Sequence, residues 1–81
     1  MGEIQSKVIQ IISTQLGKDE SEIQMNSHFI EDLDADSLDI VELILTFEEA
    51  FKIDISDEAA AEMTSVQDVF NFVKKIIEEK G

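Results

Sequence analysis

The 81-residue sequence contains no cysteine, and all six of its basic residues are lysines. Without cysteine the chain cannot form disulfides, use a thiolate of its own as a nucleophile or bind a metal through sulfur. Any thiol chemistry therefore needs a sulfur that the chain does not encode. Without arginine the chain also lacks the forked donor that usually grips a carboxylate or phosphate at two points. The lack of arginine favours a protein that is itself bound by its partners.

Positive charge is scarce as well, because six lysines stand against 19 acidic residues and give a net charge of −13. This sign disfavours nucleic acid and anionic bilayers and predicts basic protein partners. No apolar run approaches the ~20 residues needed to span a bilayer, and the N-terminus lacks the pattern of a signal peptide. Residues 1–6 fit a loose myristoylation pattern, but no basic cluster supports anchoring. We therefore expect a cytoplasmic protein. We also expect it to be a monomer.

The spacing of the apolar residues predicts one all-α domain over residues 1–81, with 43% of the chain apolar. A helical stripe from Ile4 to Leu16 predicts a first helix over about 3–16, and Gly17 follows where a left-handed cap is cheapest. Residues 17–35 mix turn formers with scattered apolar residues, which indicates a long loop. Phe29, Ile30 and Leu33 are expected to pin this loop to the core.

Capping residues mark the starts of three further helices. Asp36 and Asp39 form a box-like pattern before an apolar-rich segment that runs to Phe51 and is expected to be buried on a broad face. Ser56 precedes a short third helix that reaches about Met63. Thr64-Ser65 precede a fourth helix with apolar residues from 66 to 77. No segment alternates like a strand, so the sequence predicts a four-helix bundle with three main helices and one short one.

Four aspartates, at positions 32, 34, 36 and 39, surround Ser37 and raise the question of what their charge holds. An EF-hand would place its glycine at Ser37 and its bidentate glutamate at Leu43, and neither position fits. We therefore predict no metal site, although loose divalent-cation binding stays open. Hydrolysis is disfavoured too, because no G-x-S-x-G turn surrounds Ser37 and carboxylates oppose a developing negative charge, although His28 could act as a base. Helix capping is the simplest structural role for the serine.

Residues 31–39, EDLDADSLD, followed by Val41-Glu42-Leu43, resemble the attachment motif and recognition helix of acyl carrier proteins of type II fatty-acid synthesis. The similarity extends over nearly the whole chain and includes its length, its acidity and Thr64-Ser65-Val66-Gln67 before the last helix. Two positions depart from the family pattern. Asp34 stands where glycine is common, and Ser56 stands where proline is common, so the stiffness of the two loops is in question.

The resemblance implies that Ser37 carries 4′-phosphopantetheine, installed from coenzyme A by a phosphopantetheinyl transferase. The chain would then be a carrier of acyl thioesters for fatty-acid synthesis enzymes, not an enzyme, and the arm would supply the missing sulfur. The first-turn N–H groups of the helix would favour a phosphodiester on the serine, but Asp36 and Asp39 would oppose it, so we expect no tight phosphate pocket and a mobile arm. Basic patches on partners would meet an acidic strip, which consists of Asp36, Asp39, Glu42, Glu48 and Glu49.

The resemblance further implies that an acyl chain folds back between the helices. The candidate cavity residues are Phe29, Phe47, Ile55, Ala60, Met63 and Val69. Ordinary core packing is the alternative for each of them. Carriers of polyketide or aminoacyl groups remain an alternative within the same class, and an acidic cation-binding or adaptor module remains an alternative outside it.

Overall fold

The computed structural model of the chain describes residues 2–80, so the outermost positions of the predicted domain, 1 and 81, lie outside the described residues. Within this range the chain is helical and contains no named strand, which confirms the predicted all-α class. The elements are α1 (Gly2–Leu16), a 3-10 turn η1 (Glu20–Glu22), α2 (Ser37–Phe51), α3 (Asp57–Glu62) and α4 (Val66–Lys80). None of these helices is long and apolar enough to cross a membrane.

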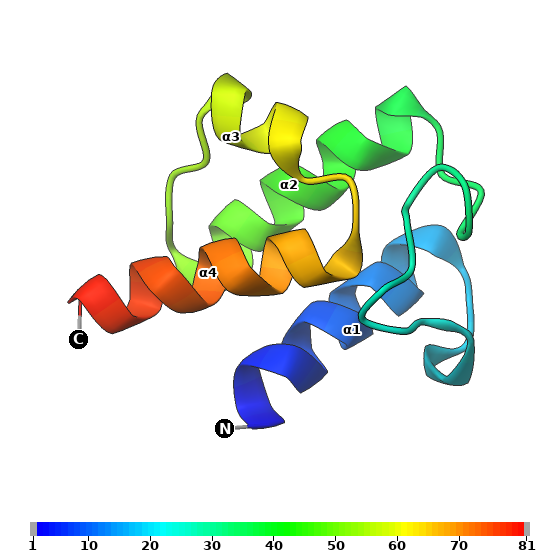
Figure 1. The fold of residues 1–81 in the computed structure, drawn as a ribbon, viewed down its shortest axis with the longest axis horizontal. Helices are drawn as coiled ribbons and strands as arrows, with labels where there is room; N and C mark the ends of the chain where they lie inside the picture. The colour runs from blue at the N-terminus through cyan, green and yellow to red at the C-terminus, as the bar shows by residue number, and fades with distance from the viewer. Residues whose placement is uncertain (1, 81) are drawn as a thin grey trace.

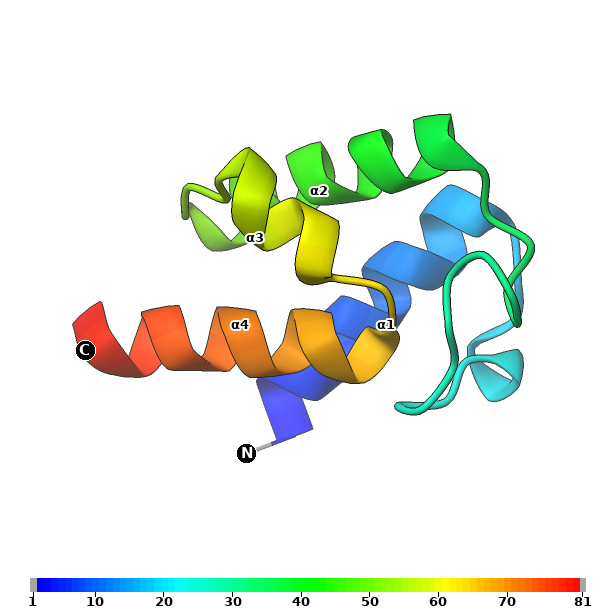
Figure 2. The same ribbon diagram turned by 45° about the horizontal axis from the view of Figure 1, so that its top comes forward.

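The three long helices form the bundle, and α1 packs against both α2 and α4. Short α3 lies on the same side of α4 as α2, and the connection between α1 and α2 covers the end of the bundle at which α2 begins (Figure 1). The view in Figure 2 shows the same arrangement, with α3 next to α2 and the long connection at the opposite end from the C-terminus. The start of α2 therefore lies between the long loop and the connection that follows α3.

Local capping explains where the helices begin and end. Gly17 adopts φ +65°, the left-handed conformation that glycine takes without a steric penalty, and it terminates α1 as predicted. Ser56 caps α3 by accepting a hydrogen bond from the Ala59 N–H at 3.1 Å. Serine at this position, where the resembling family commonly has proline, thus supplies a capping oxygen. The helix stops at Glu62, one residue before the predicted boundary.

The predicted loop between α1 and α2 is held to the rest of the protein by backbone hydrogen bonds. The N–H of Phe29 donates to the carbonyl of Thr64 at 3.0 Å, and the N–H of Val66 donates to the carbonyl of Ser27 at 3.0 Å. These bonds flank an isolated antiparallel bridge between His28 and Ser65. The loop also contains η1, where the sequence predicted no helix. Residues far apart in the sequence are therefore fixed side by side next to the start of α2.

The core is formed mainly by aliphatic side chains from the three long helices and the two connections. Phe29 and Leu33 are buried, which confirms that they pin the loop, but Ile30 is 61% exposed and the prediction for it was wrong. The loop turns at this point, so residues 30–32 are exposed while Phe29 before them and Leu33 after them face the core. The buried apolar residues are Val8, Ile12, Ile23, Phe29, Leu33, Ala35, Leu43, Phe47, Ile53, Ile55, Met63, Val66, Val69 and Val73.

The second helix is less buried than the sequence predicted. Leu38, Val41 and Leu45 are 67%, 54% and 55% exposed. They fall at spacings of three and four residues, so they share one face of α2. Leu43 and Phe47 lie on the other face and are fully buried. The apolar residues of α2 therefore divide into a core face and an outward face, and the expected broad burial was wrong.

Candidate functional site

Ser37 is the first residue of α2 and its side chain is exposed. The preceding Asp36 is the N-cap: its Oδ1 accepts the Asp39 N–H at 2.9 Å, while Asp39 Oδ2 accepts the Asp36 N–H at 3.2 Å. This reciprocal capping box confirms the predicted start of α2. Because Asp36 performs the capping, the serine hydroxyl is not needed to stabilise the helix. Helix capping, the simplest structural role for Ser37, is therefore performed by Asp36.

The first turn of α2 retains donors for an anion attached to Ser37. The capping box uses the N–H of Asp39, and the N–H of Ile40 donates to the carbonyl of Asp36 at 3.1 Å. The N–H groups of Ser37 and Leu38 have no acceptor among residues 2–80. An oxygen-linked phosphodiester on the serine would lie next to these donors and at the positive end of the helix dipole. Steric access and polarity at Ser37 therefore fit a phosphopantetheine arm.

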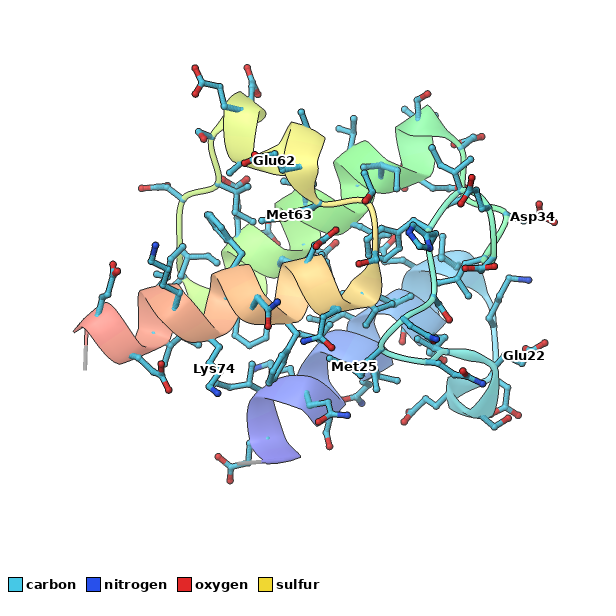
Figure 3. All side chains as sticks on the ribbon, viewed as in Figure 1. Glu22, Met25, Asp34, Glu62, Met63 and Lys74 are labelled. Atoms are coloured by element: carbon cyan, nitrogen blue, oxygen red, sulfur yellow. The ribbon has the colours of Figure 1, made fainter. Side chains whose placement is uncertain are left out.

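A cavity of about 520 Å³ opens beside Ser37, within the size range of small-molecule sites. Phe29, Ala60 and Met63 contribute to its walls, and Figure 3 shows Met63 between α3 and α2. The other three cavity candidates, Phe47, Ile55 and Val69, are buried in the core and do not line it. The full lining consists of His28, Phe29, Ile30, Glu31, Ser37, Ile40, Ala60, Ala61, Met63 and Thr64.

The four aspartates around Ser37 do not converge on one point. Asp36 and Asp39 bond to each other's backbone, and Asp32 contacts His28. Asp34 lies at the outer edge of the loop (Figure 3) and adopts φ +59°. Aspartate tolerates this left-handed conformation better than most residues, which explains how it can stand where the resembling family commonly has glycine. Among residues 2–80 no group of three or more potential ligand side chains is arranged to hold a metal ion.

His28 and Ser37 line the same cavity, but they do not form a hydrolytic pair. The His28 Nδ1 lies 3.5 Å from Asp32 Oδ2. No hydrogen bond joins the imidazole to the Ser37 hydroxyl within the described part of the chain. A nucleophilic serine needs a base within hydrogen-bonding reach. The geometry therefore gives Ser37 an accessible hydroxyl without the means to activate it.

The acidic strip predicted on α2 includes residues in different environments. Glu42 and Glu49 are exposed, and each follows an outward-facing leucine, Leu38 or Leu45, by four residues. They therefore border the exposed apolar face. Glu48 is half-buried, and its carboxylate accepts the N–H of Ile55 at 2.9 Å. This glutamate anchors the connection to α3 in addition to carrying charge.

The cavity wall formed by residues 60–64 is fixed by the start of α4. Asp68 Oδ2 accepts the N–H groups of Thr64 and Ser65 at 3.2 and 3.1 Å, and Ser65 Oγ accepts the Asp68 N–H at 3.3 Å. Burial raises the pKa of the Asp68 carboxyl, but the hydrogen bonds from Ser65 and Thr64 outweigh it and lower the pKa below its ordinary value. The ionised carboxylate therefore stabilises this turn.

An exposed serine at a capped helix start, next to an apolar cavity in a small helical bundle, is the arrangement expected of a carrier domain with a covalently attached arm. A family model described as a phosphopantetheine attachment site matches residues 6–73. The chain belongs to this family.

Three curated relatives, each named acyl carrier protein, are similar over most of the chain. The protein of Buchnera aphidicola subsp. Baizongia pistaciae is 52% identical over 77 residues, which cover 95% of this chain and 99% of the relative. The protein of Clostridium acetobutylicum is 56% identical over 73 residues, 90% of this chain and 95% of the relative. The protein of Borrelia garinii subsp. bavariensis is 56% identical over 73 residues, 90% and 91% of the two chains.

Several residues of the site were not identified from the sequence as cavity residues. Ile40 carried a signal, because it lies three residues after Ser37 and so on a neighbouring part of the same helix surface. Thr64 and His28 carried none, because they reach the cavity through hydrogen bonds between segments more than 30 residues apart.

Proposed function

We propose that the Ser37 hydroxyl is the attachment point of 4′-phosphopantetheine on this chain. The observation that supports this assignment most strongly is the position of Ser37, exposed on α2 and on the wall of the 520 Å³ cavity. As a family member with close acyl carrier relatives, the chain is a carrier of acyl groups and not a catalyst. When bound, the arm supplies the thiol that carries the acyl group as a thioester.

The attachment site can be tested by intact-mass measurement after incubation with coenzyme A and a phosphopantetheinyl transferase, the proposed loading enzyme. The wild-type chain should gain one phosphopantetheine group and Ser37→Ala should gain none. Ser56→Ala is the matched control, because Ser56 is also an exposed serine at a helix start beside acids. Modification of Ser37→Ala, or loss of modification in Ser56→Ala alone, would reject the assignment.

Fatty-acid synthesis enzymes are the partners of such a carrier, and we propose that they dock on the outward face of α2. This face combines the exposed apolar residues Leu38, Val41 and Leu45 with the bordering carboxylates of Glu42 and Glu49. A basic rim on the partner would accelerate encounter, and the apolar residues would be covered after contact. Screened charges at the rim let the carrier leave quickly, which suits serial delivery.

Charge variants separate docking from folding. Glu42→Gln and Glu49→Gln should lower the rate constant of association with a fatty-acid synthesis enzyme at low salt and reduce its salt dependence. Glu78→Gln on α4 removes the same charge away from the proposed face and should change association less. Equal effects at all three positions would indicate a non-specific contribution of the −13 net charge.

The net charge also opposes self-association, so we propose that the carrier acts as a monomer. We further propose that it acts in the cytoplasm.

The cavity is proposed to take up the proximal part of an attached acyl chain. Three of the six residues predicted from the sequence line it, namely Phe29, Ala60 and Met63, and the remaining three lie in the core. Backbone amide shifts should therefore differ between holo and long-chain acylated protein most strongly at the wall residues. Shifts that are unchanged at the wall would reject acyl binding in this cavity.

A further inference from the structure

The cavity beside Ser37 contains one group that can carry positive charge. This group is His28, the only histidine in the chain. Its side chain is 49% exposed, and the other ionisable group in the cavity lining is the acid Glu31. An arm attached to Ser37 would introduce a phosphodiester anion into the same cavity mouth. The His28 imidazole, which can carry a positive charge, therefore lies on the cavity wall that the arm must pass.

The backbone of His28 is held by hydrogen bonds, and its ring lies beside the carboxylate of Asp32. The carbonyl of His28 accepts the N–H groups of Asp32 and Leu33 at 2.9 and 3.1 Å, and its own N–H donates to Asp32 Oδ2 at 2.7 Å. The bridge to Ser65 fixes the residue from the other side. Asp32 Oδ2 also lies 3.5 Å from Nδ1, so Nε2 on the far side of the imidazole is left for a second acceptor.

We propose that His28 is a positioning residue for the prosthetic arm. In the holo-protein the protonated imidazole contacts the phosphodiester on Ser37 through Nε2, while Nδ1 faces Asp32. The contact keeps the first part of the arm over the cavity mouth, and deprotonation of the ring releases it. This inference rests on the proposed attachment at Ser37 and adds a pH-dependent placement of the arm.

The other charged side chains around His28 are carboxylates, so the imidazole is the one group among them that can attract the phosphodiester. The loop contributes Glu31 and Asp32, and the first turn of α2 contributes Asp36 and Asp39. The residues that α3 and the following connection place in the lining are uncharged, and Asp68 beyond them is committed to the cap of α4. Among these side-chain types, histidine is the one whose charge ordinarily changes between pH 5 and 8.

The test is an NMR titration of the single imidazole in apo- and holo-protein. A phosphodiester charge in contact with the ring, about 4 Å away, is worth about 1 kcal/mol in a water-like dielectric and should raise the titration midpoint of the ring by about 0.7 pH units in the holo form. The phosphodiester has no proton equilibrium between pH 5 and 8, so its ³¹P resonance reports its neighbours. In the wild type this resonance should shift with the same midpoint as the ring. Equal ring midpoints in apo- and holo-protein would overturn the proposal.

Variants identify the source of the ³¹P response. His28→Gln should remove most of its pH dependence, whereas Lys75→Gln on α4 removes a distant positive charge and should leave it unchanged. Asp32→Asn keeps an oxygen acceptor for the His28 backbone and should preserve the rise of the ring midpoint from apo to holo. A ³¹P response that persists in His28→Gln would contradict the proposal.

Failure of this proposal is distinguishable from failure of the attachment site. Intact-mass measurement of the same holo samples reports whether Ser37 is loaded, independently of the titration. If His28→Gln fails to fold, the comparison of wild-type apo- and holo-protein decides alone. A loaded Ser37 with an unshifted imidazole rejects only the role of His28, whereas an unloaded Ser37 rejects both.

Discussion

The N-cap of α2 offers a sharp test, because it stabilises the helix that presents Ser37. Asp36→Ala removes the Oδ1 that accepts the Asp39 N–H at 2.9 Å, and loss of such a cap costs about 1 kcal/mol. An unfolding entropy of about 2.1 cal/mol/K per residue gives roughly 170 cal/mol/K for this chain, so Tm should fall by about 6 °C. Thermal and urea unfolding of the apo-protein, followed by circular dichroism, measure both quantities.

Asp36→Asn is the matched control for this experiment. Asparagine caps helices about as well as aspartate, so this variant should stay within about 0.5 kcal/mol of wild type although it loses the same charge. Both variants should weaken charge-assisted docking, but only Asp36→Ala should unfold more easily. If Asp36→Ala has the same Tm as the wild type, the capping box does not stabilise α2. If the Tm of Asp36→Asn falls as far as the Tm of Asp36→Ala, the charge at the helix start stabilises α2 and the hydrogen bond does not.

Four further outcomes follow from the geometry. Lys52→Gly should raise the free energy of unfolding by about 0.5–1 kcal/mol in urea denaturation, because the C-cap of α2 has φ +56°. Ionised Asp68 contributes stability above its unfolded pKa and loses it as pH falls through the lowered folded pKa, so Asp68→Asn should flatten acid unfolding below about pH 4. Leu45→Ser should raise the KM of a partner enzyme for the loaded carrier and change stability by less than about 0.5 kcal/mol. Rising salt should slow transfer to partner enzymes mainly through association, as stopped-flow kinetics would show, and a salt-insensitive rate would contradict electrostatic docking.

The helix boundaries were predictable because they depend on residues close in sequence. Gly17 ends α1, Asp36 with Asp39 starts α2, and Ser56 starts α3, each through a contact that spans a few residues. The burial of α2 was not predictable in the same way. An apolar side chain at helical spacing can face either the core or a partner protein, and the sequence does not separate the two when both faces are apolar.

The candidate site was predicted unevenly for the same reason. Ser37 and its capping neighbours lie in one short motif, so the sequence indicated them directly. The cavity is assembled from α2, the end of α3 and the loop, and its wall depends on the pairing of residues 27–29 with 64–66. That pairing has no local signature, which is why His28 was considered only as a base for hydrolysis. Phe47, Ile55 and Val69 were apolar residues whose place in the core only the packing could reveal.

The most direct test of the account is to locate the arm on the loaded protein. Fragmentation of the intact holo-protein in a mass spectrometer assigns the added mass to one residue among the serines and threonines of the chain. The account predicts that every fragment containing Ser37 carries phosphopantetheine and that no fragment lacking Ser37 does. An arm found on any other residue would contradict it.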